Sequence, residues 1–303
     1  MTPVSPDDMT VVCVTYNSMA MLDTMAGTLA QFRHVVIIDN ASSDDTVALI
    51  RTRVPHARVI ANTCNTGFGA ANNTAIAQVG TPYALLLNPD CVIAPDDVQR
   101  LLECMQHFPR AGLAGPQNWR DEASAQISYR DAFYKPSDNG YRVPAQVLST
   151  DWIPGCCMLV KVDAFQAIGG FDPAFFLYYE DDDLCLRLRQ AGYECLLEPA
   201  AKALHVGGAS STPSLRTEFI KRFHYARSRQ LAIRRYVGAA AARVHLAKLL
   251  SAALPAMLLY TLLLRPRDVV KWAGWGYAAL SMALSLDVMP GRSCKRTATD
   301  SAG

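Results

Sequence analysis

The sequence lacks the cysteine spacing of a metal-binding framework and carries little net charge. Its nine cysteines include no Cys-x-x-Cys pair and are odd in number, which excludes a zinc framework and a secreted disulfide scaffold. We therefore expect reduced thiols in a cytoplasmic setting. The formal net charge of +2 is too small to indicate a nucleic-acid-binding protein.

Signals for secretion and for a phosphate-binding loop are also missing. The first ten residues carry Asp7 and Asp8 without a basic-then-apolar pattern, so we expect no signal peptide. The glycine-containing segment 65–73 has no Gly-Lys-Ser/Thr and is not a P-loop. At 303 residues, half of them hydrophobic, the chain can bury one large core or two modest ones.

Short apolar runs alternate with helical patterns over the first hundred residues. The runs lie at residues 11–14, 35–38, 58–60 and 84–87. Buried strands alternating with helices predict an α/β fold with a mainly parallel twisted sheet flanked by helices. Polar residues follow these runs at the carboxyl ends of the strands, where open α/β sheets bind ligands. Residues 116–150 are polar and irregular, which predicts a long functional loop.

Two carboxylates stand directly after predicted strands. Asp39 ends the second run, where it can accept the imide N–H of uracil or thymine; a turn before a helix cap is the alternative. Asp90 follows Asn88 and Pro89, and the proline limits its freedom. Such a carboxylate can hold Mg²⁺ or Mn²⁺ when diphosphate and water complete the shell; again a simple turn is the alternative. Segment 65–73 allows close backbone approach to a phosphate or sugar.

Four consecutive acidic residues, 180–183, follow the apolar aromatic stretch 174–179. Crowded carboxylates beside buried residues raise one another's pKa unless a cation or polar ligand relieves them. A helix begins here, with Asp183 spaced to pair with Arg187, so an acidic helix N-terminus is the alternative interpretation. His205 lies in an apolar stretch and suggests a core residue unless it joins Asp90 as a second metal ligand.

These motifs together resemble the family 2 inverting glycosyltransferases, in particular the rhamnosyltransferase-like branch that builds bacterial surface polysaccharides. The resemblance covers roughly residues 11–210. It is carried, in order, by residues 14–18 (Val-Thr-Tyr-Asn-Ser), 39–44 (Asp-Asn-Ala-Ser-Ser-Asp), 65–69 (Asn-Thr-Gly-Phe-Gly), 87–90 (Leu-Asn-Pro-Asp), 169–172 (Gly-Gly-Phe-Asp), 176–178 (Phe-Leu-Tyr), the acidic run 180–185 and His205.

The resemblance implies a GT-A fold and assigns roles to individual residues. Residues 1–214 would form the catalytic domain, with a nucleotide-sugar half at about 10–115 and an acceptor half at about 116–214. Asp181 would be the catalytic base beside Glu180, and Asp90 and His205 would hold Mg²⁺ or Mn²⁺. The nucleotide-sugar would contact Thr15, Tyr16, Asn17, Asp39, Asn65, Gly67, Asn73, Asn88 and Asp90. The acceptor would contact Trp152, Gly155 and Glu180.

The implied reaction moves a sugar, rhamnose or another hexose, from a nucleotide-diphosphate donor to a glycan or polyprenyl-linked acceptor. The chain departs from the family at Asp182, where an apolar residue is usual, and at residues 154–157, which replace a Ser-Gly-Ala-Cys-like stretch. A non-catalytic sugar-nucleotide or glycan-binding scaffold is the alternative, disfavoured because Asp39, Asp90 and Asp181 are all present. A nucleotidyltransferase is disfavoured because no Gly-rich loop with a following Lys or Arg lies near the start.

The last third of the chain has a different character. A basic helix with aromatic residues is predicted over 216–235, followed by apolar segments at 249–264 and 272–286 joined by the basic connector 265–271. Each apolar segment is shorter than the roughly 20 residues that span a bilayer, and a spanning hairpin would place the basic connector outside.

We therefore predict a helical extension, residues 215–290, lying on the cytoplasmic surface of the inner membrane near a lipid-linked acceptor. Packing of these helices on the catalytic domain or on a second subunit, as in a homo-oligomer, is the alternative. Nucleic acid is disfavoured as a partner because the protein lacks overall positive charge. Residues 291–303 are expected to be disordered.

Overall fold

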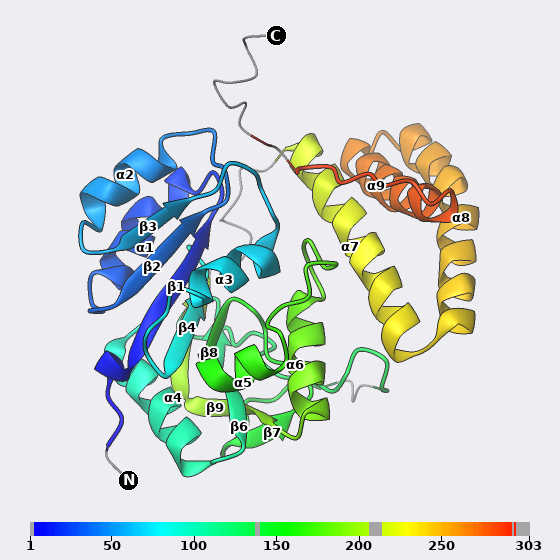
Figure 1. The fold of residues 1–303 in the computed structure, drawn as a ribbon. Coiled ribbons are helices and arrows are strands. Elements are labelled where there is room, and N and C mark those ends of the chain that lie inside the picture. The colour runs from blue at the N-terminus through cyan, green and yellow to red at the C-terminus, as the bar shows by residue number, and fades with distance from the viewer. Residues whose placement is uncertain (1–2, 137–139, 206–213, 293, 295–303) are drawn as a thin grey trace. The chain divides into compact units, whose positions relative to one another are not determined.

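A computed structural model describes residues 3–136, 140–205, 214–292 and 294 of the chain (Figure 1). It divides into two compact units. The sheet unit comprises Met1–Asp172, Asp181–Ser211 and Ser293–Gly303, and the helical unit comprises Pro173–Glu180 and Thr212–Arg292.

A nine-stranded sheet forms the sheet unit, in the order β3-β2-β1-β4-β8-β6-β9-β5 with β7 paired to β9. Strands β3, β2, β1 and β4 run parallel, as predicted. The second half is mixed, because β8 is antiparallel to β4 and β6 while β6 and β9 are parallel. The strands are β1 (Met9–Thr15), β2 (Val35–Asp39), β3 (Arg58–Ala61), β4 (Tyr83–Leu87), β5 (Cys91–Ile93), β6 (Ala111–Trp119), β7 (Leu148–Thr150), β8 (Cys157–Lys161) and β9 (Glu194–His205).

Helices cover both faces of this sheet (Figure 1). Val11 and Cys13 of β1 share a buried cluster with α1, α2 and α4, whereas Val12 between them packs with α3, α5 and α6. Alternate side chains of a strand point to opposite faces, so a strand covered on both sides reads as a continuous apolar run. The elements are η1 (Pro6–Asp8), η2 (Met19–Met21), α1 (Leu22–Leu29), α2 (Thr46–Arg53), α3 (Phe68–Ile76), α4 (Pro95–His107), α5 (Val162–Ala167) and α6 (Glu180–Gln190).

The irregular connection between β6 and β7 begins later than predicted. Strand β6 continues to Trp119 because its main chain pairs with β9 along its whole length, with register shifts. In the described residues from there to β7, only isolated bridges occur, such as the one between Arg130 and Trp152. The described part of this connection therefore has little main-chain pairing with the sheet.

Three long helices form the helical unit: α7 (Leu215–Tyr236), α8 (Ala239–Leu262) and α9 (Pro266–Ala283). Ser214 caps α7 by accepting a hydrogen bond from Thr217 N at 3.0 Å. The core of the unit is formed by Phe223, Ala226 and Ala278. The segment before α6 belongs to this unit, and its Leu177 carbonyl accepts a hydrogen bond from Ser228 Oγ at 2.9 Å.

The two helices begin earlier in the chain than the apolar segments seen in the sequence. Helix α9 starts at Pro266, so most of the basic connector lies inside it; proline suits the first helical turn, where its missing N–H leaves no bond unmade. Helix α8 starts at Ala239, because alanine continues a helix as well as leucine does. By length and composition alone, α8 is long and apolar enough to cross a membrane, in contrast to the shorter segment predicted.

The expectation that all thiols are reduced is also not met. Cys64 and Cys294 form a disulfide across a sequence separation of 230, a pairing that no local spacing reveals. The other seven cysteines are free and buried. Of the tail predicted to be disordered, Gly291, Arg292 and Cys294 are described, and the rest lies outside the described residues.

Candidate active site

The carboxyl ends of β1 and β2 bring Thr15 and Asp39 side by side. The two residues are register partners, and Thr15 Oγ1 donates to Asp39 Oδ1 at 3.2 Å. Asp39 is fully buried and accepts hydrogen bonds from Ser42 N, at 2.9 Å, and from the Ser42 hydroxyl. Asp39 therefore shapes the turn after β2, and its remaining lone pairs leave room for a further donor.

The loops after β1 and β2 are tied together by Asn17. Its backbone N–H donates to Ser42 Oγ at 2.8 Å, and its Oδ1 accepts from Ser43 N at 2.8 Å. Asn17 has φ of 50°, a left-handed conformation that asparagine tolerates better than most residues. Tyr16, half-buried beside it, donates its backbone N–H to Ser18 Oγ.

Asn40, which was not among the predicted site residues, connects the β2 loop to the glycine-containing segment. Its Nδ2 donates to Asn65 Oδ1 at 2.8 Å and to the Gly67 carbonyl at 3.1 Å. Its Oδ1 accepts from Thr66 N at 2.9 Å. Gly67 has φ of 88° at the start of α3, where glycine is favoured. The sequence signals for Asn40 are its position directly after Asp39 and its place in the 39–44 motif of the family resemblance.

Asn73 has a different setting from the other predicted nucleotide-sugar residues. Its Nδ2 donates to the Phe171 carbonyl at 2.8 Å, and its Oδ1 accepts from Phe171 N at 2.9 Å. Both polar atoms of the amide therefore hold the 169–172 turn against α3. These bonds give Asn73 a structural role, and its predicted donor contact stays a prediction.

Asp90 and His205 meet beside the β5–β9 pair. Cys91, the next residue after Asp90, is the register partner of His205, and His205 Nε2 lies 3.7 Å from Asp90 Oδ1. Asp90 is 2% exposed, and among the described residues its Oδ1 has no hydrogen-bond partner. A buried carboxylate oxygen without a donor is unfavourable unless a cation or another ligand joins it.

The surroundings of His205 direct one ring nitrogen toward Asp90. Its Nδ1 lies 3.1 Å from Gln126 Oε1, which favours Nδ1–H and leaves the Nε2 lone pair free for a ligand. Burial lowers the pKa of His205, but Cys156 and Asp90 outweigh it, so the pKa is raised overall.

This oxygen and nitrogen pair fits Mg²⁺ or Mn²⁺. No cluster of three metal-ligating side chains occurs within the described part of the chain. If an ion binds here, Asp90 and His205 would be two protein ligands, and phosphate and water would fill the remaining positions.

Asp181 lies at the start of α6, where the helix dipole favours its charged form. Its Oδ2 accepts a hydrogen bond from Gly155 N at 3.1 Å. Burial is the largest influence and raises the pKa of this carboxyl above its ordinary value, while Gly155 and Arg130 act in the opposite direction. A carboxylate with a raised pKa is a stronger base than an exposed one.

Asp182 forms an ion pair with Arg130, a residue that gave no sequence signal. The Arg130 Nη2 lies 2.7 Å and 2.8 Å from the two carboxylate oxygens, and its guanidinium lies 4.2 Å from the centre of the Trp152 ring. Burial and the neighbouring Asp181 raise the pKa of Asp182 to about 7 despite this pairing. Asp183 pairs with Arg187 at 2.6 Å, as predicted.

The segment before β8 connects these groups. Gly155 contacts Asp181. The carbonyl of the next residue, Cys156, accepts a hydrogen bond from Asn88 N at 2.9 Å, and Cys156 also neighbours His205. The sheet unit therefore brings Asp90, His205 and Asp181 to one short stretch of main chain. Glu180, the buried first residue of α6, is grouped with the helical unit, and its predicted role stays a prediction.

Comparison with known proteins identifies the class. The fold resembles a mannosyltransferase from Pyrobaculum calidifontis, solved with GDP-Man and Mn²⁺, with a TM-score of 0.58 and 15% identity over 93% of this chain and 89% of that one. It also resembles GalNAc-T7, solved with UDP, GalNAc and Mn²⁺ (TM-score 0.54, 15% identity, 73% of this chain and 50% of that one). The architecture is thus that of a GT-A glycosyltransferase, as predicted.

Residues 10–169 match the model of glycosyl transferase family 2, and the chain belongs to this family. Residues 144–236 also match a model described as the N-terminal domain of galactosyltransferase. The chain is 30% identical over 233 residues to the N-acetylglucosaminyl-diphospho-decaprenol L-rhamnosyltransferase of Mycobacterium tuberculosis, covering 66% of this chain and 76% of that protein. It is 33% identical over 160 residues to the rhamnosyltransferase WbbL of Escherichia coli K12, covering 46% and 60%. The protein is a glycosyltransferase of cell-surface glycan synthesis.

Proposed function

We propose that this enzyme transfers rhamnose or another hexose, with inversion, from a nucleoside-diphosphate donor to a polyprenyl-diphosphate-linked glycan. The proposal depends on three contacts around residues 155–156: Gly155 N donates to Asp181, Asn88 N donates to the Cys156 carbonyl, and His205, a neighbour of Cys156, lies 3.7 Å from Asp90. The rhamnosyltransferase relatives support the donor, and the decaprenol named for one of them supports the acceptor.

Asp181 acts as the general base in this proposal. It takes the proton of an acceptor hydroxyl while that oxygen attacks the anomeric carbon. The new glycosidic bond forms as the bond from the anomeric carbon to the diphosphate oxygen breaks, and the nucleoside diphosphate leaves. The hydrogen bond from Gly155 N fixes one carboxylate oxygen, so the carboxyl group keeps one orientation toward the acceptor.

Residues at the carboxyl ends of the strands hold the nucleotide-sugar donor. The Asp39 carboxylate accepts the imide N–H of a uracil or thymine base, and the loops pinned by Asn17 and Asn40 surround the nucleoside. Asp90 and His205 would hold Mg²⁺ or Mn²⁺, an ion that stabilises negative charge on a leaving diphosphate when it is bound.

The helical unit brings the enzyme to the cytoplasmic surface of the membrane. It contains 13 Lys or Arg and four Asp or Glu, a net charge of +9, while the whole chain carries only +2. Exposed leucines lie along α8, including Leu254 at 64% and Leu258 at 60%. A basic unit with an exposed apolar helix suits peripheral binding to an anionic leaflet.

A nucleotide-sugar panel tests the proposal. Thermal stabilisation by each donor is measured with Mn²⁺, and the donors that bind are then assayed for transfer to a polyprenyl-diphosphate acceptor, with the product's anomeric configuration read by NMR. Stabilisation by a dTDP- or UDP-sugar and an inverted product are expected. Donor binding without any transfer would favour the sugar-nucleotide-binding scaffold, and a retained configuration would overturn the inverting mechanism.

A further inference from the structure

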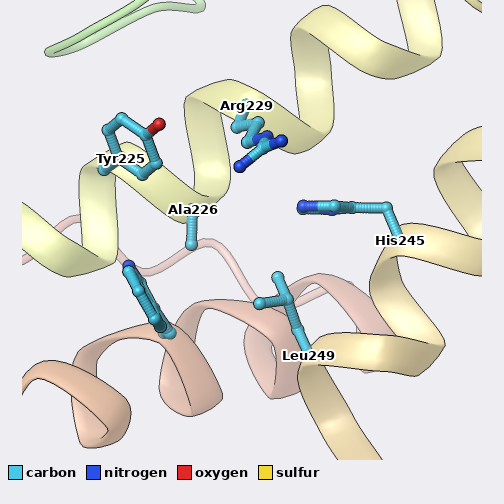
Figure 2. Close-up of a pocket in the computed structure, with 6 residues that line it drawn as sticks. Tyr225, Ala226, Arg229, His245 and Leu249 are labelled. Atoms are coloured by element: carbon cyan, nitrogen blue, oxygen red, sulfur yellow. The ribbon is translucent and has the colours of Figure 1, made fainter. Parts of the chain in front are cut away.

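The three helices of the helical unit line a partly open pocket of about 100 Å³. Figure 2 shows Arg229 on α7 and His245 on α8 directed into the same space between these helices, with Leu249 one turn further along α8. The cavity is lined by Tyr225, Ala226, Arg229, His245, Leu249 and Trp275. Its walls are aromatic and aliphatic, so the basic side chains are its main polar features.

Two of the polar groups at the cavity, on Arg229 and Trp275, have no acceptor within the described protein residues. Arg229 is exposed and, within the described residues, makes no hydrogen bond or ion pair, while the buried Trp275 Nε1 has no hydrogen-bond partner. His245 Nδ1 is engaged by Gln230 Oε1 at 2.8 Å. No carboxylate is among the lining residues. Unpaired donors in a partly enclosed apolar site are stabilised when an anion enters.

The charge around the cavity is positive. Lys271 Nζ lies 4.8 Å from the centre of the Trp275 ring, and Arg222 lies 5.9 Å from it. Burial lowers the pKa of His245, and the nearby Arg229 and Lys248 lower it further. Of the acidic groups in this unit, Glu218 is paired with Arg222 and Asp268 with Arg265.

We propose that this pocket binds the phosphate end of an isoprenoid lipid phosphate. The guanidinium of Arg229 matches the geometry of phosphate oxygens, and the aromatic walls suit the first part of a hydrocarbon chain. The cavity is smaller than a typical ligand pocket of 300–1,000 Å³, so the rest of the chain would lie outside it, along the exposed leucines that follow on α8. The inference rests on the proposed function, and it makes this pocket the anchor of the lipid-linked acceptor.

Binding of farnesyl diphosphate to the full-length protein tests the proposal, with inorganic diphosphate and farnesol as separate probes. Calorimetry should show farnesyl diphosphate binding at least tenfold more tightly than either probe. Arg229→Gln should weaken that binding at least tenfold. Arg243→Gln removes a charge from an exposed position of α8 outside the pocket and should change it less than twofold.

Equal effects of Arg229→Gln and Arg243→Gln would overturn the assignment. If inorganic diphosphate binds as tightly as farnesyl diphosphate, the pocket is only a site for free anions. If farnesol binds as tightly, the pocket is only an apolar cavity. Either result rejects the proposal. Because Arg229→Gln could alter the fold of the unit, the His245 pKa of the wild-type protein is followed by NMR as well. It should rise when farnesyl diphosphate binds, since an anion stabilises the imidazolium, and an unchanged pKa contradicts the proposal.

The nucleotide-sugar panel separates this inference from the proposed function. If no donor stabilises the wild-type protein but the Arg229-dependent binding persists, the proposed function fails and the pocket stands. If donors bind and sugar is transferred while farnesyl diphosphate binds independently of Arg229, the pocket fails and the proposed function stands.

Discussion

One guanidinium nitrogen of Arg130 contacts both carboxylate oxygens of Asp182, directly beside the proposed base Asp181. The same guanidinium stacks on the Trp152 ring. Asp182 occupies a position where the family resemblance predicts an apolar residue, so this chain places an additional carboxylate next to Asp181. Arg130 offsets that charge and lowers the pKa of Asp181 against the raising effect of burial. We interpret Arg130 as a residue that acts through Asp181: it compensates for the negative charge of Asp182 and so keeps the pKa of Asp181 lower.

Replacing Arg130 should therefore move the pH dependence of catalysis. In Arg130→Met the pKa of Asp181 rises, and because a general base must be ionised to act, the acid limb of the kcat/KM profile should move to higher pH. If the pKa rises by about one, activity on that limb falls about tenfold. Arg130→Lys should keep most of the wild-type profile. The double variant Arg130→Met/Asp182→Leu should restore it, and an acid limb that does not move in Arg130→Met would contradict this role.

Asp90 and His205 should control the affinity for a divalent ion. Asp90→Asn and His205→Gln should each weaken Mn²⁺ binding about 10- to 100-fold in the presence of a nucleoside diphosphate. The first removes the negative charge of a ligand, and the second replaces the imidazole nitrogen by a weaker amide ligand. Free Mn²⁺ is measured by EPR, which needs no turnover. Asp96→Asn, at an exposed position of α4, is the matched control. Unchanged Mn²⁺ affinity in both site variants would show that Asp90 and His205 do not bind the ion.

Chelation gives an independent check of the same site. EDTA in excess should abolish sugar transfer, and added Mn²⁺ or Mg²⁺ should restore it, since the ion neutralises charge on the leaving diphosphate. Full transfer activity after exhaustive chelation would mean that the enzyme needs no divalent ion.

The exposed leucines of α8 should be needed for membrane binding. Leu254→Glu and Leu258→Glu place charges where an apolar surface would enter the lipid interface, so flotation with anionic liposomes should decrease strongly while the melting temperature stays close to that of the wild type. Met19→Glu changes an exposed apolar side chain of the sheet unit and serves as the control. Equal flotation of all three variants would favour helices that pack on protein instead.

The disulfide between Cys64 and Cys294 should contribute measurably to stability. A cross-link over so long a stretch of chain restricts the unfolded state and typically contributes about 2–4 kcal/mol. Cys64→Ser and Cys294→Ser should lower the unfolding free energy by the same amount, and the double variant should lower it no further. Additive losses would show that the two thiols act independently.

Much of the sheet unit could be predicted from the sequence because β1, β2 and β4 are buried on both faces. The apolar runs in β1, β2 and β4 stop at polar residues. These polar residues predicted that ligands bind at the carboxyl ends of the strands. The antiparallel insertion of β8 could not be predicted, since a short buried run carries no information about its direction.

The site was less predictable where distant residues meet. No local spacing connects Asp90 and His205. The residues alone left His205 as a core residue or a second metal ligand, and the family resemblance chose between these interpretations. Arg130 lies in an irregular segment without periodicity, so no local pattern indicated that it would pair with Asp182. The start of α8 was missed because its first turn consists of alanines, which are compatible with a helix or with other buried structure.

Sugar transfer by Asp181→Asn tests the central claim most directly. Asparagine keeps the size of the side chain but cannot accept the acceptor's proton, so kcat should fall about 10²- to 10⁴-fold while thermal stabilisation by the donor is retained. Asp96→Asn should leave kcat unchanged. A kcat for Asp181→Asn within a few-fold of the wild type, with the donor still bound, would show that Asp181 is not the base.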